Sequence, residues 1–115
     1  MKTVSFDFDG TLQRQDVQDY AMSIKDCHKL IIVTHRMPFL SYRDIFQVAA
    51  KIGIPKESIY FVHKSGKVKF FQKHPVALHL DNNYFIVLEI RKKAQVMALD
   101  VSSFNWRSEA NKILL

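Results

Sequence analysis

The sequence predicts a doubly wound α/β fold, in which a parallel sheet of about five strands carries helices on both faces. Two observations predict it. Short apolar runs of strand length alternate with amphipathic stretches of helix length along the 115 residues, an alternation that is typical of a parallel sheet covered by helices. Polar residues also follow several of the apolar runs directly, at the strand ends where ligands bind to this class of fold.

The first third of the chain contains two expected strands with a helix between them. Residues 3–6 form an apolar strand, and residues 30–33 are a continuous, largely β-branched run, which is the pattern of a central strand buried on both faces. Between them, Asp16 is expected to cap a helix with an apolar face at i, i+3, i+4 and i+7 spacing. That face is formed by Val17, Tyr20, Ala21 and Ile24.

The next helix has the clearest boundaries in the sequence. Ser41 and Asp44 form a capping-box-like start, Gly53 supplies a left-handed stop, and Pro55 prevents the helix from continuing. A short third strand is expected at residues 59–61.

The remainder of the chain completes the pattern. A basic stretch at residues 63–74 precedes an expected strand at 76–80. Residues 84–93 favour a strand by propensity, but their place between two strands favours a helix, which we predict. A fifth strand follows at 96–99, and Ser103 is expected to cap a C-terminal helix.

Composition indicates one globular domain spanning residues 1–115, since 48% of residues are hydrophobic and 24% are charged. No secretory leader and no apolar run of bilayer length is apparent, so we expect a cytoplasmic protein without a membrane partner. The single cysteine excludes an internal disulfide. The net charge of +6 would attract polyanions, although a solvated lysine face explains it equally well. The sequence does not indicate an oligomeric state.

Polar residues at three predicted strand ends are candidates for chemistry. Asp7, Thr34 and Asp81 each follow an apolar run, so they should meet at one edge of the sheet. Asp7 and Asp9 lie two residues apart, and their carboxylates point the same way if the strand geometry continues. Gly10 then allows a sharp turn. Converging carboxylates repel each other unless a cation lies between them, which predicts a metal site.

Residues 6–12, Phe-Asp-Phe-Asp-Gly-Thr-Leu, resemble motif I of the haloacid dehalogenase-like (HAD) superfamily, an apolar strand followed by D-x-D-G-T. The resemblance implies a Rossmann-like catalytic core and phosphohydrolase activity. Asp7 would be the nucleophile that becomes an aspartyl phosphate. Asp9 would be the general acid and base, and its backbone carbonyl would bind the Mg²⁺ cofactor together with Asp7.

The second and third motifs of the family follow in the same order. The apolar run that ends at Thr34 is similar to motif II, which implies that Thr34 hydrogen-bonds the transferred phosphoryl group. His35 and Arg36 come next and would flank the same phosphate pocket. Motif III is a lysine near a helix start, and Lys67 is the best placed to bind the phosphate and neutralise the nucleophile. The alternatives are Lys64 and Lys69.

The fourth motif is an apolar strand followed by acidic residues, and Asp81 matches it in position as the remaining Mg²⁺ ligand. Here the sequence departs from the pattern, because Asn82 and Asn83 supply no second acid. We therefore expect weaker metal binding. His79 shares a strand face with Asp81, either as a metal ligand or as a hydrogen-bonded core residue, and the second interpretation is favoured.

Members of this superfamily that act on small metabolites usually carry a cap domain, and the short connections before residue 17 and after residue 61 leave no space for one. An open site favours a phosphate on a macromolecule. We therefore expect a Mg²⁺-dependent phosphatase acting on a nucleotide or nucleic acid phosphate, or next on a phosphoprotein. The alternative is a catalytically weak HAD-fold protein that binds nucleic acid or an acidic partner through its basic stretch.

Overall fold

A five-stranded parallel sheet forms the centre of the structure, a computed structural model that describes residues 1–36, 40–63 and 66–115. Its strands are β1 (Thr3–Phe6), β2 (Lys29–Thr34), β3 (Ile59–Phe61), β4 (Leu78–Asp81) and β5 (Ala98–Asp100). They lie in the order β3-β2-β1-β4-β5, and every neighbouring pair is parallel. The predicted doubly wound α/β class is confirmed.

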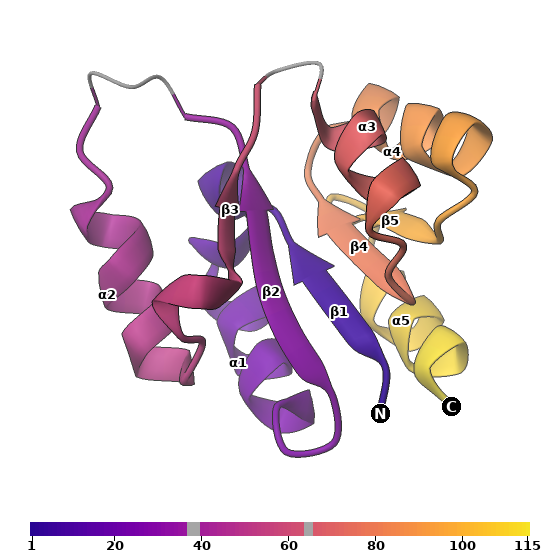
Figure 1. Ribbon diagram of the computed structural model, residues 1–115. Coiled ribbons are helices and arrows are strands. Elements are labelled where there is room, and N and C mark those ends of the chain that lie inside the picture. The colour runs from indigo at the N-terminus through magenta and orange to yellow at the C-terminus, as the bar shows by residue number, and fades with distance from the viewer. Residues whose placement is uncertain (37–39, 64–65) are drawn as a thin grey trace.

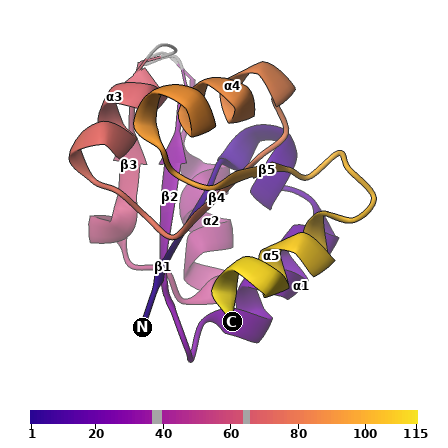
Figure 2. The same cartoon turned by 90° about the vertical axis from the view of Figure 1, so that its right-hand side faces the viewer.

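Helices cover both faces of this sheet (Figure 1). The α-helices in the described part of the chain are α1 (Gln15–Ile24), α2 (Arg43–Ile52), α3 (Gly66–Lys73), α4 (Tyr84–Glu89) and α5 (Trp106–Leu114). Short π- or 3₁₀-helical segments lie between strands and α-helices along the chain: η1 (Phe8–Leu12), η2 (Lys56–Ser58) and η3 (Ile90–Ala94). Helices α1, α2 and α5 pack on one face, whereas α3, α4 and η3 pack on the other (Figure 2).

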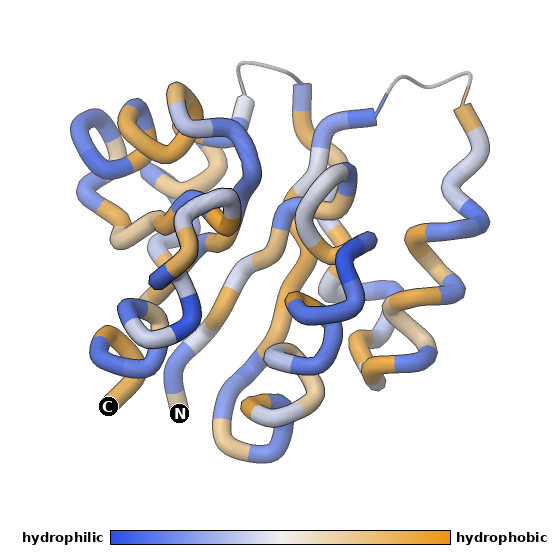
Figure 3. Tube along the Cα trace, turned by 180° about the vertical axis from the view of Figure 1, so that it is seen from behind, coloured by the Kyte–Doolittle hydropathy of each residue, from blue (hydrophilic) through white to orange (hydrophobic). Residues whose placement is uncertain are grey.

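The hydrophobic core is divided by the sheet into two clusters, one on each face. Strand β2 contributes to both: Leu30 and Ile32 pack on the α1 side, and Ile31 and Val33 on the α3 side. This burial on both faces explains its continuous apolar run. The middle of β2 is accordingly orange in Figure 3, whereas the helices carry both colours.

The predicted caps of the first two helices are wrong. Helix α1 begins one residue before Asp16, whose carboxylate accepts the Val17 N–H (3.0 Å) and pairs with Arg14 (2.6 Å) within the first turn. In α2, the Ser41 hydroxyl oxygen accepts the Arg43 N–H (3.2 Å), so no capping box forms. The predicted stop is confirmed, because Gly53 lies in the left-handed region with φ 101°.

The second half of the chain also differs from prediction at one helix start. Ser103 does not cap α5, since its hydroxyl donates to Oδ1 of Asn105 (2.6 Å). The predicted helix after β4 is confirmed as α4 and η3. Its cap is Asn83, whose side chain accepts the N–H groups of Phe85 (3.0 Å) and Ile86 (3.2 Å). This cap and the burial of the helix against the sheet outweigh its strand propensity.

The connections at the carboxyl edge of the sheet are short. Residues 7–14 join β1 to α1, and residues 62–65 join β3 to α3. Neither is long enough to form a cap domain, as predicted. The carboxyl ends of β1 and β4 are therefore not covered by a domain inserted at either point.

Candidate active site

The carboxyl ends of β1 and β4 lie side by side where the order of the strands reverses. From β1 the chain adds β2 and β3 on one side, then crosses back and adds β4 and β5 on the other. Asp7 directly follows β1, and its N–H donates to the carbonyl of Leu80 in β4 (2.9 Å). Asp81 is the last residue of β4. Ligands bind at such a switch point in doubly wound sheets, and both predicted carboxylates are there.

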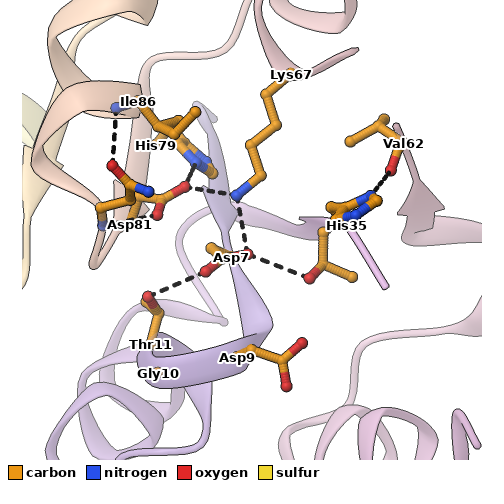
Figure 4. A network of polar contacts seen from close by, with 12 residues as sticks. Asp7, Asp9, Gly10, Thr11, His35, Val62, Lys67, His79, Asp81 and Ile86 are labelled. Carbon is orange, nitrogen blue, oxygen red and sulfur yellow. Dashed lines mark hydrogen bonds and ion pairs between the residues drawn. The ribbon is translucent and has the colours of Figure 1, made fainter. Parts of the chain in front are cut away.

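The carboxylate of Asp7 is buried and is held by side chains from three other elements (Figure 4). Its Oδ1 accepts a hydrogen bond from the Thr34 hydroxyl at the end of β2 (3.2 Å). The same oxygen lies 2.9 Å from Nζ of Lys67, which belongs to the first turn of α3. Its Oδ2 accepts a long hydrogen bond from the Thr11 hydroxyl in η1 (3.5 Å). Three predicted site residues, Asp7, Thr34 and Lys67, therefore meet.

Lys67 lies between two buried carboxylates. Its Nζ is 2.9 Å from Oδ1 of Asp7 and 2.7 Å from Oδ2 of Asp81. Burial alone would lower the pKa of Lys67, but the two carboxylates outweigh it and raise that pKa. Burial raises the pKa of Asp7, with repulsion from Asp81 adding to it and Lys67 opposing it. Lys67 thus carries the positive charge of the site.

The two alternative lysines have different outcomes. Lys69 lies on the same helix as Lys67, but its side chain is exposed to solvent. Lys64 lies outside the described residues. Of the described lysines, Lys67 is the one that contacts Asp7.

Asp81 is oriented by a hydrogen-bond network that runs along one face of the sheet from β4 to β1. Besides Lys67, its Oδ2 is bonded by Nε2 of His79 (2.9 Å), and its Oδ1 accepts the Asn83 N–H (3.0 Å). The other ring nitrogen of His79 is 2.9 Å from the Ser5 hydroxyl. Burial would raise the pKa of Asp81, but His79 and Lys67 together hold it well below its usual range. His79 is completely buried, so the interpretation as a hydrogen-bonded core residue is confirmed.

Asp9 does not point toward Asp7 (Figure 4), so the expectation that the two carboxylates converge is wrong. The strand geometry ends at Phe6, and η1 turns the chain through Gly10, which has φ 78°. The carboxylate of Asp9 is about half exposed and forms an ion pair with Arg36 (2.5 Å). Arg36 is thereby directed to a carboxylate and not to the predicted phosphate pocket.

Asn82 lies against the two oxygen atoms that were predicted to bind metal. With its amide nitrogen toward them, it donates to Oδ2 of Asp7 (3.3 Å) and to the carbonyl oxygen of Asp9 (3.1 Å). With its amide oxygen on that side, three oxygens would meet and a cation would be needed between them. Gly10 permits this approach, because a Cβ there would lie 2.8 Å from Cγ of Asn82.

Side chains alone do not provide a complete set of Mg²⁺ ligands at this site. Among the described residues, no three His, Cys, Asp or Glu side chains are grouped so as to hold a metal ion. The set consists instead of two carboxylates, Asp7 and Asp81, and the Asp9 carbonyl, with Asn82 beside it. All are hard oxygen ligands, which Mg²⁺ prefers, and Mg²⁺ commonly completes its shell with water and substrate phosphate. The ligand types present are therefore ones that Mg²⁺ takes, with water and a phosphate left to complete its shell.

His35 is next to Thr34 but is tied to the backbone. Its Nδ1 lies 3.0 Å from the carbonyl oxygen of Val62 (Figure 4). If Nδ1 donates there, Nε2 is the ring atom left to contact a phosphate. Its predicted role in phosphate binding stays a prediction.

Three further polar contacts shape the site, and sequence reasoning missed two of them. The bond from His79 to Asp81 had a signal, since residues two apart share a strand face, and a hydrogen-bonded core His79 on that face was expected. The bond from Arg36 to Asp9 and the contact of Asn82 with Asp7 had none, because they join segments distant in the sequence.

Neither a protein-family model nor a curated protein matches this sequence. Searching the described residues for a helix long and apolar enough to cross a membrane finds none.

Proposed function

We propose that this protein hydrolyses phosphomonoesters through an aspartyl-phosphate intermediate on Asp7, with Mg²⁺ as cofactor, as its resemblance to the HAD superfamily implies. One observation supports this most strongly: a single oxygen of Asp7 contacts both the Lys67 ammonium and the Thr34 hydroxyl at the switch point of the sheet. A cation and a hydroxyl donor beside a buried carboxylate suit the stabilisation of phosphoryl oxygens.

In the first step, Oδ1 of Asp7 attacks phosphorus, a bond forms between them, and the bond from phosphorus to the ester oxygen breaks. Asp9, after leaving Arg36 and taking up a proton from solvent, gives that proton to the leaving oxygen. Lys67 and Thr34 donate hydrogen bonds to the equatorial phosphoryl oxygens. Because Asp9 is paired with Arg36, it must turn toward Asp7 before it can act.

In the second step, water attacks the phosphorus of the aspartyl phosphate and gives a proton to Asp9. The bond between phosphorus and Oδ1 of Asp7 breaks, which releases inorganic phosphate and restores the carboxylate. Mg²⁺, held by Asp7, the Asp9 carbonyl and Asp81, would neutralise negative charge on the phosphoryl group.

The open site supports a large substrate. The short connections leave the carboxyl edge of the sheet without a cap domain, and the net charge of +6 attracts polyanions. A nucleotide or polynucleotide phosphate is therefore the leading substrate class, and a phosphoprotein is the next.

A phosphomonoester screen tests the proposal. Small esters and end-phosphorylated oligonucleotides would be incubated with the wild type in Mg²⁺ and again in a chelator. Asp7→Asn should abolish phosphate release, because an amide cannot form the acyl phosphate, while Lys69→Gln should retain it on small esters. Turnover that persists in the chelator or in Asp7→Asn would refute the mechanism.

The rival is a HAD-fold binding protein with little or no turnover, and the Asn82 contact favours it. The Asn82 amide can satisfy Oδ2 of Asp7 and the Asp9 carbonyl without a metal ion, just as Lys67 neutralises Asp7 and Asp81. Oligonucleotide binding that is equally tight with and without Mg²⁺, together with no phosphate release from any ester, would favour this rival.

A further inference from the structure

Arg36 holds the carboxylate of Asp9 outside the candidate active site. Its Nη2 lies 2.5 Å from Oδ1 of Asp9, and its Nε lies 3.4 Å from Oδ2. The guanidinium also lies over the ring of Phe8, 5.4 Å from the ring centroid. The Arg36 side chain is 7% exposed and that of Asp9 is 48% exposed, so the pairing lies at the surface of the protein, with most of the arginine stem covered.

Arg36 is bound more firmly to the start of α2 than to Asp9. Its Nη1 donates to the Ser41 carbonyl (2.7 Å) and to Oδ1 of Asp44 (2.5 Å), and its Nη2 also reaches Oδ2 of Asp44 (3.1 Å). These three hydrogen bonds hold the Arg36 guanidinium at Ser41 and Asp44. When Asp9 turns toward Asp7, Arg36 should therefore remain behind with an unpaired side facing solvent.

That side faces an open pocket of about 530 Å³ next to Asp9. Most of its lining residues are polar, and they include Arg36, Ser41, Arg43, Asp44 and Gln47. Because Asp9 must reach the leaving oxygen of a substrate held at Asp7, the leaving group extends toward this side of the site. An anionic group on the leaving group could take the position at Arg36 that Asp9 vacates.

We propose that Arg36 exchanges the Asp9 carboxylate for a second anionic group of the substrate, which makes it both a positioning residue for Asp9 and a determinant of specificity. The substrate class is then a phosphomonoester whose leaving group carries a phosphodiester, as in the end of an oligonucleotide. Binding of that group releases Asp9 for proton transfer. This inference rests on the proposed phosphohydrolase function.

The test compares two substrates with the same ester and leaving oxygen, a 5′-phosphorylated dinucleotide and its 5′-mononucleotide. Wild type should prefer the dinucleotide by about tenfold in kcat/KM. Arg36→Gln should reduce this ratio to about one, mainly by slowing the dinucleotide. Arg43→Gln is the matched control, since Arg43 lines the same pocket but has no ion pair among the described residues, and its ratio should stay near that of the wild type.

A binding measurement separates this inference from the proposed function. In the Asp7→Asn background, calorimetry should give the same preference for the dinucleotide, and adding Asp9→Asn should increase that preference, because the competing carboxylate is gone. This second variant does not depend on whether Arg36→Gln folds. The inference is overturned if Arg36→Gln weakens both ligands equally, if Arg43→Gln removes the preference as fully, or if Asp9→Asn leaves it unchanged. Arg36-dependent binding without turnover of any ester would instead refute the phosphohydrolase function.

Discussion

The ammonium of Lys67 lies 2.9 Å from Oδ1 of Asp7, although the two residues are 60 positions apart in the sequence. The same ammonium contacts Asp81, so one lysine neutralises the carboxylates that follow β1 and end β4. The helix start that carries Lys67 is thereby joined electrostatically to both strand ends. The consequences of this contact and of three others can be measured.

Lys67→Met should destabilise the protein as well as inactivate it. Removing the ammonium leaves Asp7 and Asp81 buried without their cation, which costs about 3 kcal/mol in the free energy of unfolding. Urea denaturation near neutral pH would measure it. Lys69→Met, an exposed change on the same helix, should alter stability by less than about 0.5 kcal/mol. Equal effects of the two substitutions would mean that the buried pairs contribute no more than a surface charge.

Asn82→Asp should make the protein depend on Mg²⁺ for its stability. A carboxylate in place of the amide would face Oδ2 of Asp7 and the Asp9 carbonyl, which are both acceptors, so the metal-free variant should melt below the wild type. Mg²⁺ should bind about tenfold more tightly and raise its Tm more than that of the wild type.

Asn83→Asp is the control for this change. It adds the same charge one residue further along, where the side chain caps α4, and aspartate caps helices as well as asparagine does. Its response to Mg²⁺ should resemble that of the wild type. If both variants respond alike, the effect of Asn82→Asp reflects net charge and not a ligand at the metal site.

Gly10→Ala should be more damaging than Gly53→Ala. Both glycines have positive φ, 78° and 101°, and either alanine should cost about 1–2 kcal/mol in backbone strain. Only at Gly10 would the new Cβ meet Asn82, whereas nothing lies within 4 Å of it at Gly53. Chemical denaturation should therefore show the larger loss of unfolding free energy for Gly10→Ala. Adding Asn82→Ala should restore the part of this loss that exceeds the loss in Gly53→Ala. No recovery would show that Asn82 does not restrict this position.

Asp44→Asn should remove stability only where the carboxyl is ionised. Hydrogen bonds from Arg36 hold the pKa of Asp44 below its ordinary value of 3.8. A carboxyl with a lowered folded-state pKa stabilises the fold above its ordinary pKa, and this stability is lost as pH falls through the lowered value. The free energy of unfolding of the wild type should therefore exceed that of Asp44→Asn at pH 6, and the two should converge as pH falls through the lowered pKa of Asp44.

The Arg36→Gln background provides the control for the pH dependence. Without the guanidinium, the Asp44→Asn substitution should have nearly the same small effect at every pH. A difference that persists from pH 6 to pH 3 in both backgrounds would show that Arg36 does not lower the pKa of Asp44.

The sequence alone determined the order of the elements and the residues at the ends of the strands. Apolar periodicity is a local property, so the runs before Asp7, Thr34 and Asp81 predicted strands, and the alternation with helices predicted a parallel sheet. The carboxyl ends of parallel strands share one edge, which is why the pattern of apolar runs was enough to place these three side chains together. Lys67 was favoured through the resemblance to the HAD superfamily, whose third motif is a lysine near a helix start, and α3 does begin at Gly66.

Only the tertiary structure decided the direction of the polar side chains beyond the strand ends. Asp9 turns away because the backbone leaves strand geometry at η1 and because Arg36, fixed by Asp44 of α2, attracts its carboxylate. The amide of Asn82 reaches Asp7 only because β4 lies next to β1 and Gly10 has no Cβ. Such contacts join residues far apart in the chain, so local pattern and propensity contain no signal for them.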